Sequence, residues 1–274
     1  MPTTTPRVPA SVALVDMDTI LWKYGMMADS SQDRWDPDDW AAGDPTALAK
    51  ATILQKLDFI REDLGLRVVI VAAEAGCGNF RKTLSPAYKA NRRERPDIMT
   101  ELYEWGHNEL NPLTISGQPL ETDDILAINQ DPRGSTVIVS NDKDMLTVPG
   151  WNYNPFNGAL RWITPASAKL FHMYQTLTGD STDNIRGAKG IGPKRAAQVL
   201  LTALEHLPES GGAAVPENER ALWGVVNAAF LLAGQTTDDM RLAQRLTHIG
   251  YPSQCPTSFR NPRGLKALLN YVKE

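Results

Sequence analysis

The sequence has few cysteines, no long apolar run and no excess of positive charge. Its two cysteines, Cys77 and Cys255, do not have the spacing of metal ligands and cannot build a disulfide framework, which indicates a reduced, cytoplasmic setting. No apolar run reaches the roughly 18 residues that a membrane span needs, and the first residues do not form a secretory signal. We therefore expect a cytoplasmic protein without a membrane partner.

At first sight the lack of positive charge argues against nucleic acid as a partner. The net charge is −4 over 274 residues, whereas basic groups recognise a DNA backbone. A net value hides distribution, however, and local clusters decide what a phosphate group meets. Acidic and basic residues are segregated along this chain, so DNA stays a candidate partner.

Three short, β-branched segments predict a buried parallel sheet. They are Val12–Val15, Arg67–Ala72 and Thr136–Ser140, each bounded by polar or turn residues. Helical patterns lie between them, notably in Pro45–Leu64 and Asp123–Asn129. Strands that alternate with helices indicate an α/β fold with a mostly parallel central sheet flanked by helices. Functional groups of such folds gather at the carboxyl ends of the strands.

The character of the sequence changes after about residue 165. Residues 164–179 predict a helix with a Ser/Thr-rich start and a Gly stop, followed by a Gly-rich basic turn and a second helix. The rest is helical in pattern to about residue 247. We therefore expect an α/β domain over residues 1–165 and a helical region over residues 166–274.

Acidic residues cluster in four short segments, LVDMD, ETDD, NDKDM and GDSTDN, and Glu74 adds a fifth position after a predicted strand. Asp180 and Asp183 share a face if they lie on a helix, and Asp142 and Asp144 share one if the chain is extended. If the segments converge, carboxylates repel and retain protons unless cations lie among them. Oxygen ligands without His or Cys favour Mg²⁺ or Mn²⁺, and two such ions about 4 Å apart would clamp a phosphodiester and activate water. The candidate ligands are Asp16, Asp18, Glu74, Glu121, Asp123, Asp124, Asp142, Asp144, Asp180 and Asp183.

Each of these residues also has a structural interpretation. A single Asp after a strand more often caps a helix or forms a turn than binds a metal. Capping is the stronger alternative for Asp18 and Asp124. Five acidic segments in one α/β chain shift the balance towards a metal site.

Two basic segments complement the acidic ones. Residues 79–96 carry six cations against the single acid Glu94, which predicts either a solvated helical face or a mobile element that grips phosphates and stabilises charge in a transition state. Residues 187–194 form a Gly-rich turn before a helix, where free N–H groups bind anions. With a helix on either side, this turn is typical of a hairpin that contacts a nucleic-acid backbone. The cations of the first segment are Arg81, Lys82, Lys89, Arg92, Arg93 and Arg95.

These motifs, in this order, resemble the 5′ nuclease family, which includes phage exonucleases, the N-terminal nuclease domain of bacterial DNA polymerase I and the flap endonucleases. The runs FRKTLSPAYKANR, ETDDIL, SNDKDM and TGDSTDNIRGAKGIGPKRAAQVL carry the resemblance, which extends over residues 12–200. It implies a PIN-like nuclease fold with a helical arch and a helix–three-turn–helix (H3TH) motif at about residues 180–200. It also implies a monomeric hydrolase that cuts DNA with a free 5′ end or a 5′ flap and leaves 5′-phosphate products.

The resemblance further implies roles for individual residues. Arg81 and Lys89 would face the scissile phosphate at the base of the arch, and the turn at residues 190–192 would bind K⁺ between protein and DNA. Glu74 departs from the family, which usually has Asp at this position. One Mg²⁺ would be held by Asp16, Glu74, Glu121 and Asp123 or Asp124, and a second would be surrounded by Asp142, Asp144, Asp180 and Asp183. The DNA contacts would come from Arg92, Arg93, Gly187, Lys189, Gly190, Ile191, Gly192, Lys194 and Arg195.

Three other functions stay open from the sequence. Asp16 and Asp18 also resemble the start of haloacid-dehalogenase-like phosphatases, in which the first Asp is a nucleophile, but that pattern leaves GIGPK without a role. A non-catalytic DNA-binding module would be marked by lost ligands, whereas the acidic set here is complete. A metal-dependent RNase would differ only in its substrate, because backbone contacts discriminate the sugar weakly.

Overall fold

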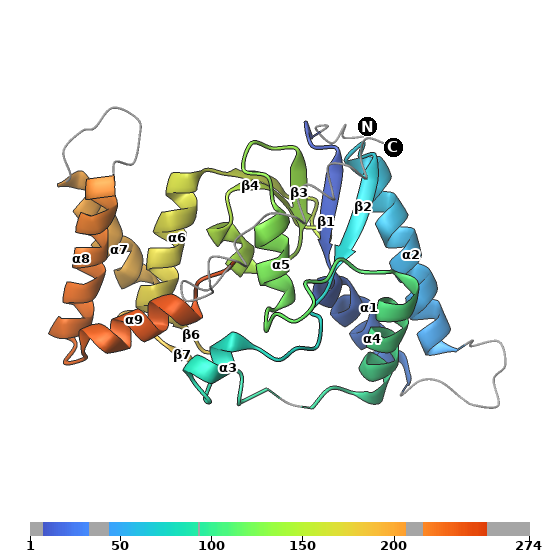
Figure 1. The fold of residues 1–274 in the computed structure, drawn as a ribbon, viewed down its shortest axis with the longest axis horizontal. Helices are drawn as coiled ribbons and strands as arrows, with labels where there is room; N and C mark the ends of the chain where they lie inside the picture. Colours follow the sequence, from blue (N-terminus) through green and yellow to red (C-terminus); the bar gives the residue numbers. More distant parts are fainter. Residues whose placement is uncertain (1–7, 33–43, 93, 207–215, 251–274) are drawn as a thin grey trace.

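The computed structural model describes residues 8–32, 44–92, 94–206 and 216–250, and these residues are built around one five-stranded sheet. Its strands are β1 (Val12–Asp16), β2 (Val68–Ala72), β3 (Thr136–Val139), β4 (Gly150–Tyr153) and β5 (Leu160–Ile163). They lie in the order β2-β1-β3-β4-β5 (Figure 1). The first four run parallel, and β5 pairs antiparallel with β4.

Helices cover both faces of this sheet. Successive residues of a strand point to opposite faces, so Ala13 and Val15 of β1 enter one core while Val12 and Leu14 enter another. Figure 1 shows the helices that close the two cores on either side of the sheet. The first core packs against α1 (Met17–Gln32), α2 (Pro45–Asp63) and α4 (Asp97–Glu109), and the second packs against α5 (Thr122–Asn129) and the 3-10 helix η1 (Lys143–Thr147).

Local sequence signals fix where the helices begin. The side chain of Asp44 accepts a hydrogen bond from the Thr46 backbone N–H at 2.9 Å, and Pro45 fills the first turn of α2. Thr164 caps α6 in the same way before a second proline. Such residues satisfy backbone N–H groups that have no partner within the helix.

Four helices beyond the sheet share a separate apolar core. Met173 and Leu177 of the first of them pack with Val226 and Phe230 of the third. In Figure 1 this helical module lies beside the sheet, and α6 is the member between α8 and the sheet. The helices are α6 (Pro165–Thr178), α7 (Pro193–Glu205), α8 (Pro216–Leu232) and α9 (Thr237–Leu246).

The predicted α/β class with a helical C-terminal region is confirmed, but two local predictions are wrong. Asp180 and Asp183 do not lie on a helix, because Gly179 ends α6 and the chain turns into a hairpin of β6 (Gly179–Asp180) and β7 (Ile185–Arg186). Asp142 and Asp144 are not on an extended strand, since Asp142 caps η1. The strands β4 and β5 were not predicted. The predicted division after residue 165 falls one residue into α6 and stays a prediction.

No helix in the described ranges is both long enough and apolar enough to cross a membrane.

His172 on α6 is a half-buried imidazole that the fold keeps neutral. Its Nε2 lies 2.9 Å from the Gln244 carbonyl oxygen, and its ring packs 5.3 Å from that of Trp223. Burial, aided by the neighbouring His248, lowers the pKa of His172 to about 4. In the unfolded chain the side chain takes up a proton below its ordinary pKa. The free energy of unfolding must therefore decrease as the pH is lowered from about 6.5 to about 4.

We therefore expect the free energy of unfolding to be lower at pH 5 than at pH 7 by about 2 kcal/mol through this residue. His172→Gln, which keeps a side-chain N–H donor but does not titrate, should remove that share of the pH dependence. Urea unfolding of both proteins at the two pH values checks this. The same pH slope in the variant would show that His172 does not cause it.

Candidate active site

Acidic side chains meet at the carboxyl edge of the sheet. Asp16 is the last residue of β1, Glu74 follows β2 and Asp142 follows β3. These three strands are neighbours and parallel, so their ends open on one edge. The start of α5 brings Glu121 and Asp123 to the same place, because α5 packs against β1 and β2.

Asp16 is the most enclosed member of the cluster on the strands. Its carboxylate accepts hydrogen bonds from the Thr19 hydroxyl at 2.7 Å and the Ser140 hydroxyl at 2.8 Å. Burial and the nearby Asp18 charge raise the pKa of Asp16 to about 6, against the opposing hydrogen bonds. The side chain is thus oriented by its neighbours and resists ionisation in the absence of a cation.

Glu74 and Asp123 also lie where burial and neighbouring carboxylates disfavour their charged forms. Burial, followed by the charges of Asp142, Asp16 and Glu121, raises the pKa of Asp123. Burial and the Asp18 charge raise the pKa of Glu74. Like charges that must share a site are relieved by protons or by cations.

A second group of carboxylates lies between η1 and the β6–β7 hairpin. Burial and the charges of Asp142 and Asp180 raise the pKa of Asp144 to about 7. The Gln175 side-chain amide of α6 donates to Asp144 at 2.5 Å, and Lys143 Nζ lies 2.7 Å from Asp180. Burial and the Asp183 charge raise the pKa of Asp142, so the two groups of carboxylates adjoin.

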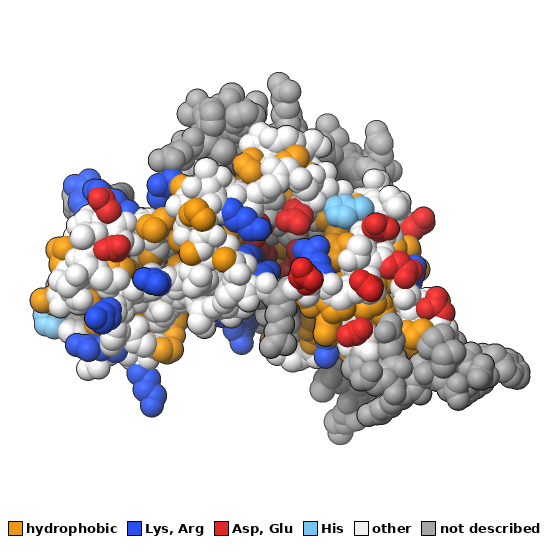
Figure 2. Space-filling view, turned by 90° about the horizontal axis from the view of Figure 1, so that it is seen from below, with side chains coloured by type: hydrophobic (Ala, Val, Ile, Leu, Met, Phe, Trp, Pro, Cys, Tyr) orange, Lys and Arg blue, Asp and Glu red, His pale blue; other side chains and the backbone are white. Residues whose placement is uncertain are grey.

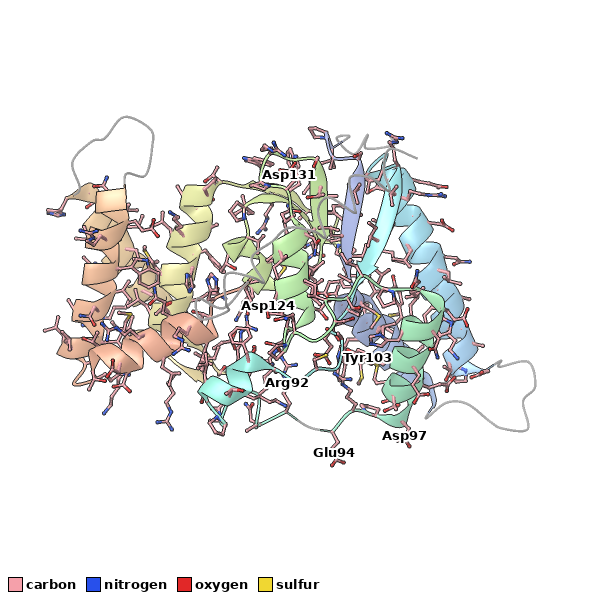
Figure 3. The ribbon with its side chains drawn as sticks, in the orientation of Figure 1. Arg92, Glu94, Asp97, Tyr103, Asp124 and Asp131 are labelled. Carbon is pink, nitrogen blue, oxygen red and sulfur yellow. The ribbon has the colours of Figure 1, made fainter. Side chains whose placement is uncertain are left out.

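Residues 85–92, which we call the strap, are attached to the β6–β7 hairpin. Lys89 N donates to the Asp183 carbonyl at 2.9 Å, and the Asn184 side chain donates to the Ala87 carbonyl at 2.8 Å. The strap follows the short helix α3 (Phe80–Leu84) and precedes α4 in the chain, and it carries Lys89, which was predicted to lie at the base of the arch. In Figure 3 the labelled Arg92 lies beneath α5 on this segment.

Lys89 joins the two groups of carboxylates. Its Nζ lies 2.5 Å from Glu121 Oε1 and 3.6 Å from Asp183 Oδ2. Burial disfavours the charged amine, but Glu121 and Asp183 outweigh it and raise the pKa of Lys89, so it stays protonated at neutral pH. Arg92 adds a contact of 2.7 Å to Asp183. The predicted residue Arg93 lies outside the described residues.

The prediction that Arg81 faces the cleft is wrong. Its side chain is 1% exposed and its two Nη atoms contact Asp124 at 2.8 and 2.7 Å. Nη1 also contacts Glu121 at 2.7 Å, and Nε donates to the Leu246 carbonyl at 3.1 Å. Arg81 therefore ties α3, α5 and the end of α9 together, and has no free donor directed at a substrate.

Asp124 is consequently not placed to bind a metal, contrary to the sequence prediction. Besides Arg81, its oxygens accept the backbone N–H groups of Gly250 at 2.9 Å and Glu121 at 3.1 Å, and its side chain is fully buried. Asp18 accepts hydrogen bonds from the hydroxyls of Thr122, at 2.8 Å, and Tyr103. Of the two doubtful positions, only Asp124 is removed from the metal cluster.

The Gly-rich turn before α7 separates into a packed part and an open part. A Cβ on Gly187 would lie 2.3 Å from the Leu177 carbonyl and 2.4 Å from Gly179 N, so packing alone requires this glycine. Gly190, at φ +76°, and Gly192, the N-cap of α7, have open space where a side chain would be. Lys189, Lys194 and Arg195 are exposed, Ile191 is half-buried, and basic side chains predominate over the module in Figure 2.

Several residues of the site were missed in the sequence. Thr19, Ser140 and Gln175 orient carboxylates, and the hydroxyl of Tyr88 lies 2.9 Å from Glu121 and 3.2 Å from Asp183. Tyr88 stands beside Lys89 in a basic run of the sequence, and this was the one sequence feature that could have identified it as a site residue. The others depend on tertiary contacts.

The donor set suits hard divalent cations, because it consists of carboxylate oxygens that repel one another. Within the described residues, no three His, Cys, Asp or Glu side chains are arranged so that they could hold a metal ion together. Lys89, Lys143 and Arg92 pair with the carboxylates instead. Three features define the class of this protein: an acidic sheet edge, a basic strap, and a basic turn with open glycines before α7. It is an α/β protein suited to divalent cations and to a phosphodiester backbone.

The family is shown by comparison with known proteins. Residues 12–163 match the family described as 5′-3′ exonuclease, N-terminal resolvase-like domain. The chain belongs to this family. The match covers the whole sheet and the edge that carries the carboxylates, and it leaves the phosphatase interpretation without support.

Curated relatives agree with this assignment. DNA polymerase I of Rhizobium leguminosarum is 34% identical over 139 residues, which cover 44% of this chain and 14% of that protein. Flap endonuclease Xni of Shewanella woodyi is 30% identical over 149 residues, or 48% and 58% of the two chains. The exonuclease of Escherichia phage T7 is 29% identical over 196 residues, or 62% and 65%. The matched part is thus under two thirds of each relative.

Solved structures share the fold. A bacteriophage T5 flap endonuclease in a complex with DNA and metal ions has a TM-score of 0.55 at 17% identity, and the match covers 96% of this chain and 99% of that one. A T5 5′-exonuclease with bound zinc has a TM-score of 0.51 at 18% identity, covering 86% and 96%.

If Arg81 is structural, its loss must reduce stability. We expect Arg81→Met to lower the free energy of unfolding by about 3–5 kcal/mol, since it leaves Asp124 buried without its cation. Arg81→Met combined with Asp124→Leu should recover part of that loss. Urea unfolding of the three proteins checks this; a single variant that is as stable as the wild type but inactive would restore a catalytic role to Arg81.

Proposed function

We propose that this chain hydrolyses DNA phosphodiesters near a free 5′ end, as a 5′–3′ exonuclease, a 5′-flap endonuclease or both. The observation that carries the proposal is the bridge from Lys89 to Glu121 and Asp183, which sets a protonated amine among two adjoining groups of carboxylates. Membership of the 5′-3′ exonuclease family supports the same activity.

Two divalent ions, Mg²⁺ or Mn²⁺, would complete this site. They would supply charge stabilisation at the phosphate and a hydroxide-like water at neutral pH. The residues that would hold the first are Asp16, Glu74, Glu121, Asp123 and Asp142, and those that would surround the second are Asp142, Asp144, Asp180 and Asp183. The fit rests on oxygen donors whose pKa values are raised by burial and by neighbouring carboxylates, as for Asp123 and Asp144.

The chain's own groups would orient the scissile phosphate. Lys89 holds a positive charge beside the carboxylates, where it can neutralise a phosphate oxygen as negative charge develops. Tyr88 keeps Glu121 and Asp183 in place for it. Arg92 is half exposed at the outer side of the strap, where it can contact the strand that leads to the site.

The Gly-rich turn at residues 187–192 and the start of α7 would hold the duplex part of the DNA. The first turn of α7 offers backbone N–H groups to a phosphate, and Gly190 and Gly192 let the backbones approach. Lys189, Lys194 and Arg195 add charge without a base-specific pattern. A K⁺ ion at residues 190–192 would fit between the turn and a phosphate. The products released by cleavage would carry a 5′-phosphate.

Asp142→Asn tests the assignment directly. We expect it to reduce cleavage of a 5′-flap duplex, labelled at either end, by at least about 100-fold in Mg²⁺, and to leave binding equal or stronger because a repulsive charge is lost. EDTA should abolish the wild-type reaction. Asp97→Asn, on the exposed side of α4 (Figure 3), is the control and should cut normally. Near-normal turnover by Asp142→Asn would exclude the metal role.

The difference between the packed glycine and the open glycines of the Gly-rich turn gives a second test. Gly192→Ala has space for its methyl group and should weaken duplex binding about tenfold with little change in unfolding, since it would separate the turn from the phosphate. Gly187→Ala should lower stability first, because its methyl group meets backbone atoms. Anisotropy titrations beside thermal unfolding distinguish the two. Normal binding by Gly192→Ala would remove this turn from the DNA interface.

A further inference from the structure

An open cavity of about 390 Å³ lies beside the carboxylate cluster, and the proposed mechanism does not use it. Glu104, His107 and Asn108 of α4 line it together with Glu74 from the loop after β2. Because Glu74 also belongs to the cluster, the cavity and the proposed metal site share a wall.

Arg95 gives this cavity a flat, fixed surface. Its guanidinium carbon lies 4.1 Å from the centroid of the Tyr103 ring, and the Tyr103 hydroxyl donates to Asp18. Tyr103 is buried and Arg95 is exposed, so the tyrosine ring supports the guanidinium while the arginine stays accessible from solvent. A guanidinium plane is a good stacking surface for a nucleobase.

The charges in the cavity favour a base over a phosphate. Two carboxylates, Glu74 and Glu104, stand against the one guanidinium of Arg95, so a phosphate would meet net repulsion. A neutral heterocycle with N–H donors would instead find carboxylate acceptors and the Asn108 amide. Guanine suits this set best, since its adjacent ring and amino N–H groups can pair with one carboxylate in a bidentate manner.

The outer face of α4 limits how much of a strand can follow. Asp97 and Glu109 are exposed on α4, and in Figure 2 acidic side chains dominate this half of the molecule, opposite the basic helical module. A strand that continued across this face would bring its phosphates against these acids. The surface therefore favours one inserted base over a long bound strand.

We propose that this cavity binds the base of the unpaired 5′ nucleotide next to the scissile phosphate, with Arg95 as the stacking group and Glu104 as the acceptor that prefers guanine. This inference rests on the proposed function, because it takes the DNA to lie on the hairpin and at the carboxylates. It assigns α4 a role in substrate selection.

The test is the affinity for hairpin duplexes that carry one unpaired 5′ nucleotide, measured by anisotropy in EDTA so that the DNA stays intact. The nucleotide is guanine, thymine or an abasic residue. We expect guanine to bind about tenfold more tightly than the abasic form, with thymine between them. Arg95→Met should bring all three to similar affinity. Glu104→Gln should remove the preference for guanine over thymine and keep that for a base over the abasic form.

Arg67→Met is the matched control, because Arg67 is exposed just before β2, at the opposite end of the strand from Glu74. It should keep the wild-type order. Equal affinity of the wild type for base and abasic duplexes, with flap cleavage intact, would overturn this inference alone. A base preference that survives in Arg95→Met would also overturn it. Absence of binding to every duplex, together with absence of cleavage, would contradict the proposed function as well.

Discussion

Carboxylates at one edge of a parallel sheet repel one another, and most of the contacts around the site reduce that repulsion. The strand order places Asp16, Glu74 and Asp142 at neighbouring strand ends, and burial then denies them the solvent that would screen their charges. The raised pKa values of Asp16, to about 6, and Asp144, to about 7, express that cost. Each lysine or arginine that reaches this edge reduces the electrostatic cost of the carboxylates. This explains why a chain with net charge −4 places lysine and arginine side chains beside the carboxyl edge of the sheet.

The basic segment after β2 reduces this repulsion in two different ways. Arg81 is fully buried and neutralises Asp124 and Glu121 from within the protein, which joins the sheet domain to the end of α9. Lys89 reaches Glu121 from the open side. Both contact the same glutamate, so the structural ion pair fixes the position of the group that Lys89 needs. A bidentate guanidinium suits the permanent contact, and a flexible lysine suits one that a substrate must displace.

Much of the site could be predicted from the sequence because local order and topology determine it. Short β-branched strands between helices imply a parallel sheet, and the acids that follow them must then share an edge. The sequence could not distinguish Asp123 from its neighbour Asp124, since adjacent residues on α5 point in different directions and only the position of Arg81 decides which is enclosed. It likewise could not place Asp180 and Asp183 on a hairpin, because the glycine that ends α6 changes the geometry of the residues after it. Strands β4 and β5 were missed because GWNY and LRWI are short and lack a clear alternating pattern.

Helix α6 connects the two parts of the proposed machinery. Its Gln175 donates to Asp144 at 2.5 Å, and its C-terminal end continues directly into Asp180 of the hairpin. The next turn, which carries the open glycines, is bonded back to α6 through Ala188 N and the Leu177 carbonyl at 2.8 Å. Asp144, Asp180 and the Gly-rich turn are therefore attached to one helix that packs into the core of the helical module. A duplex held by that turn would lie at a fixed distance from the acidic edge, because both are joined to the same packed helix.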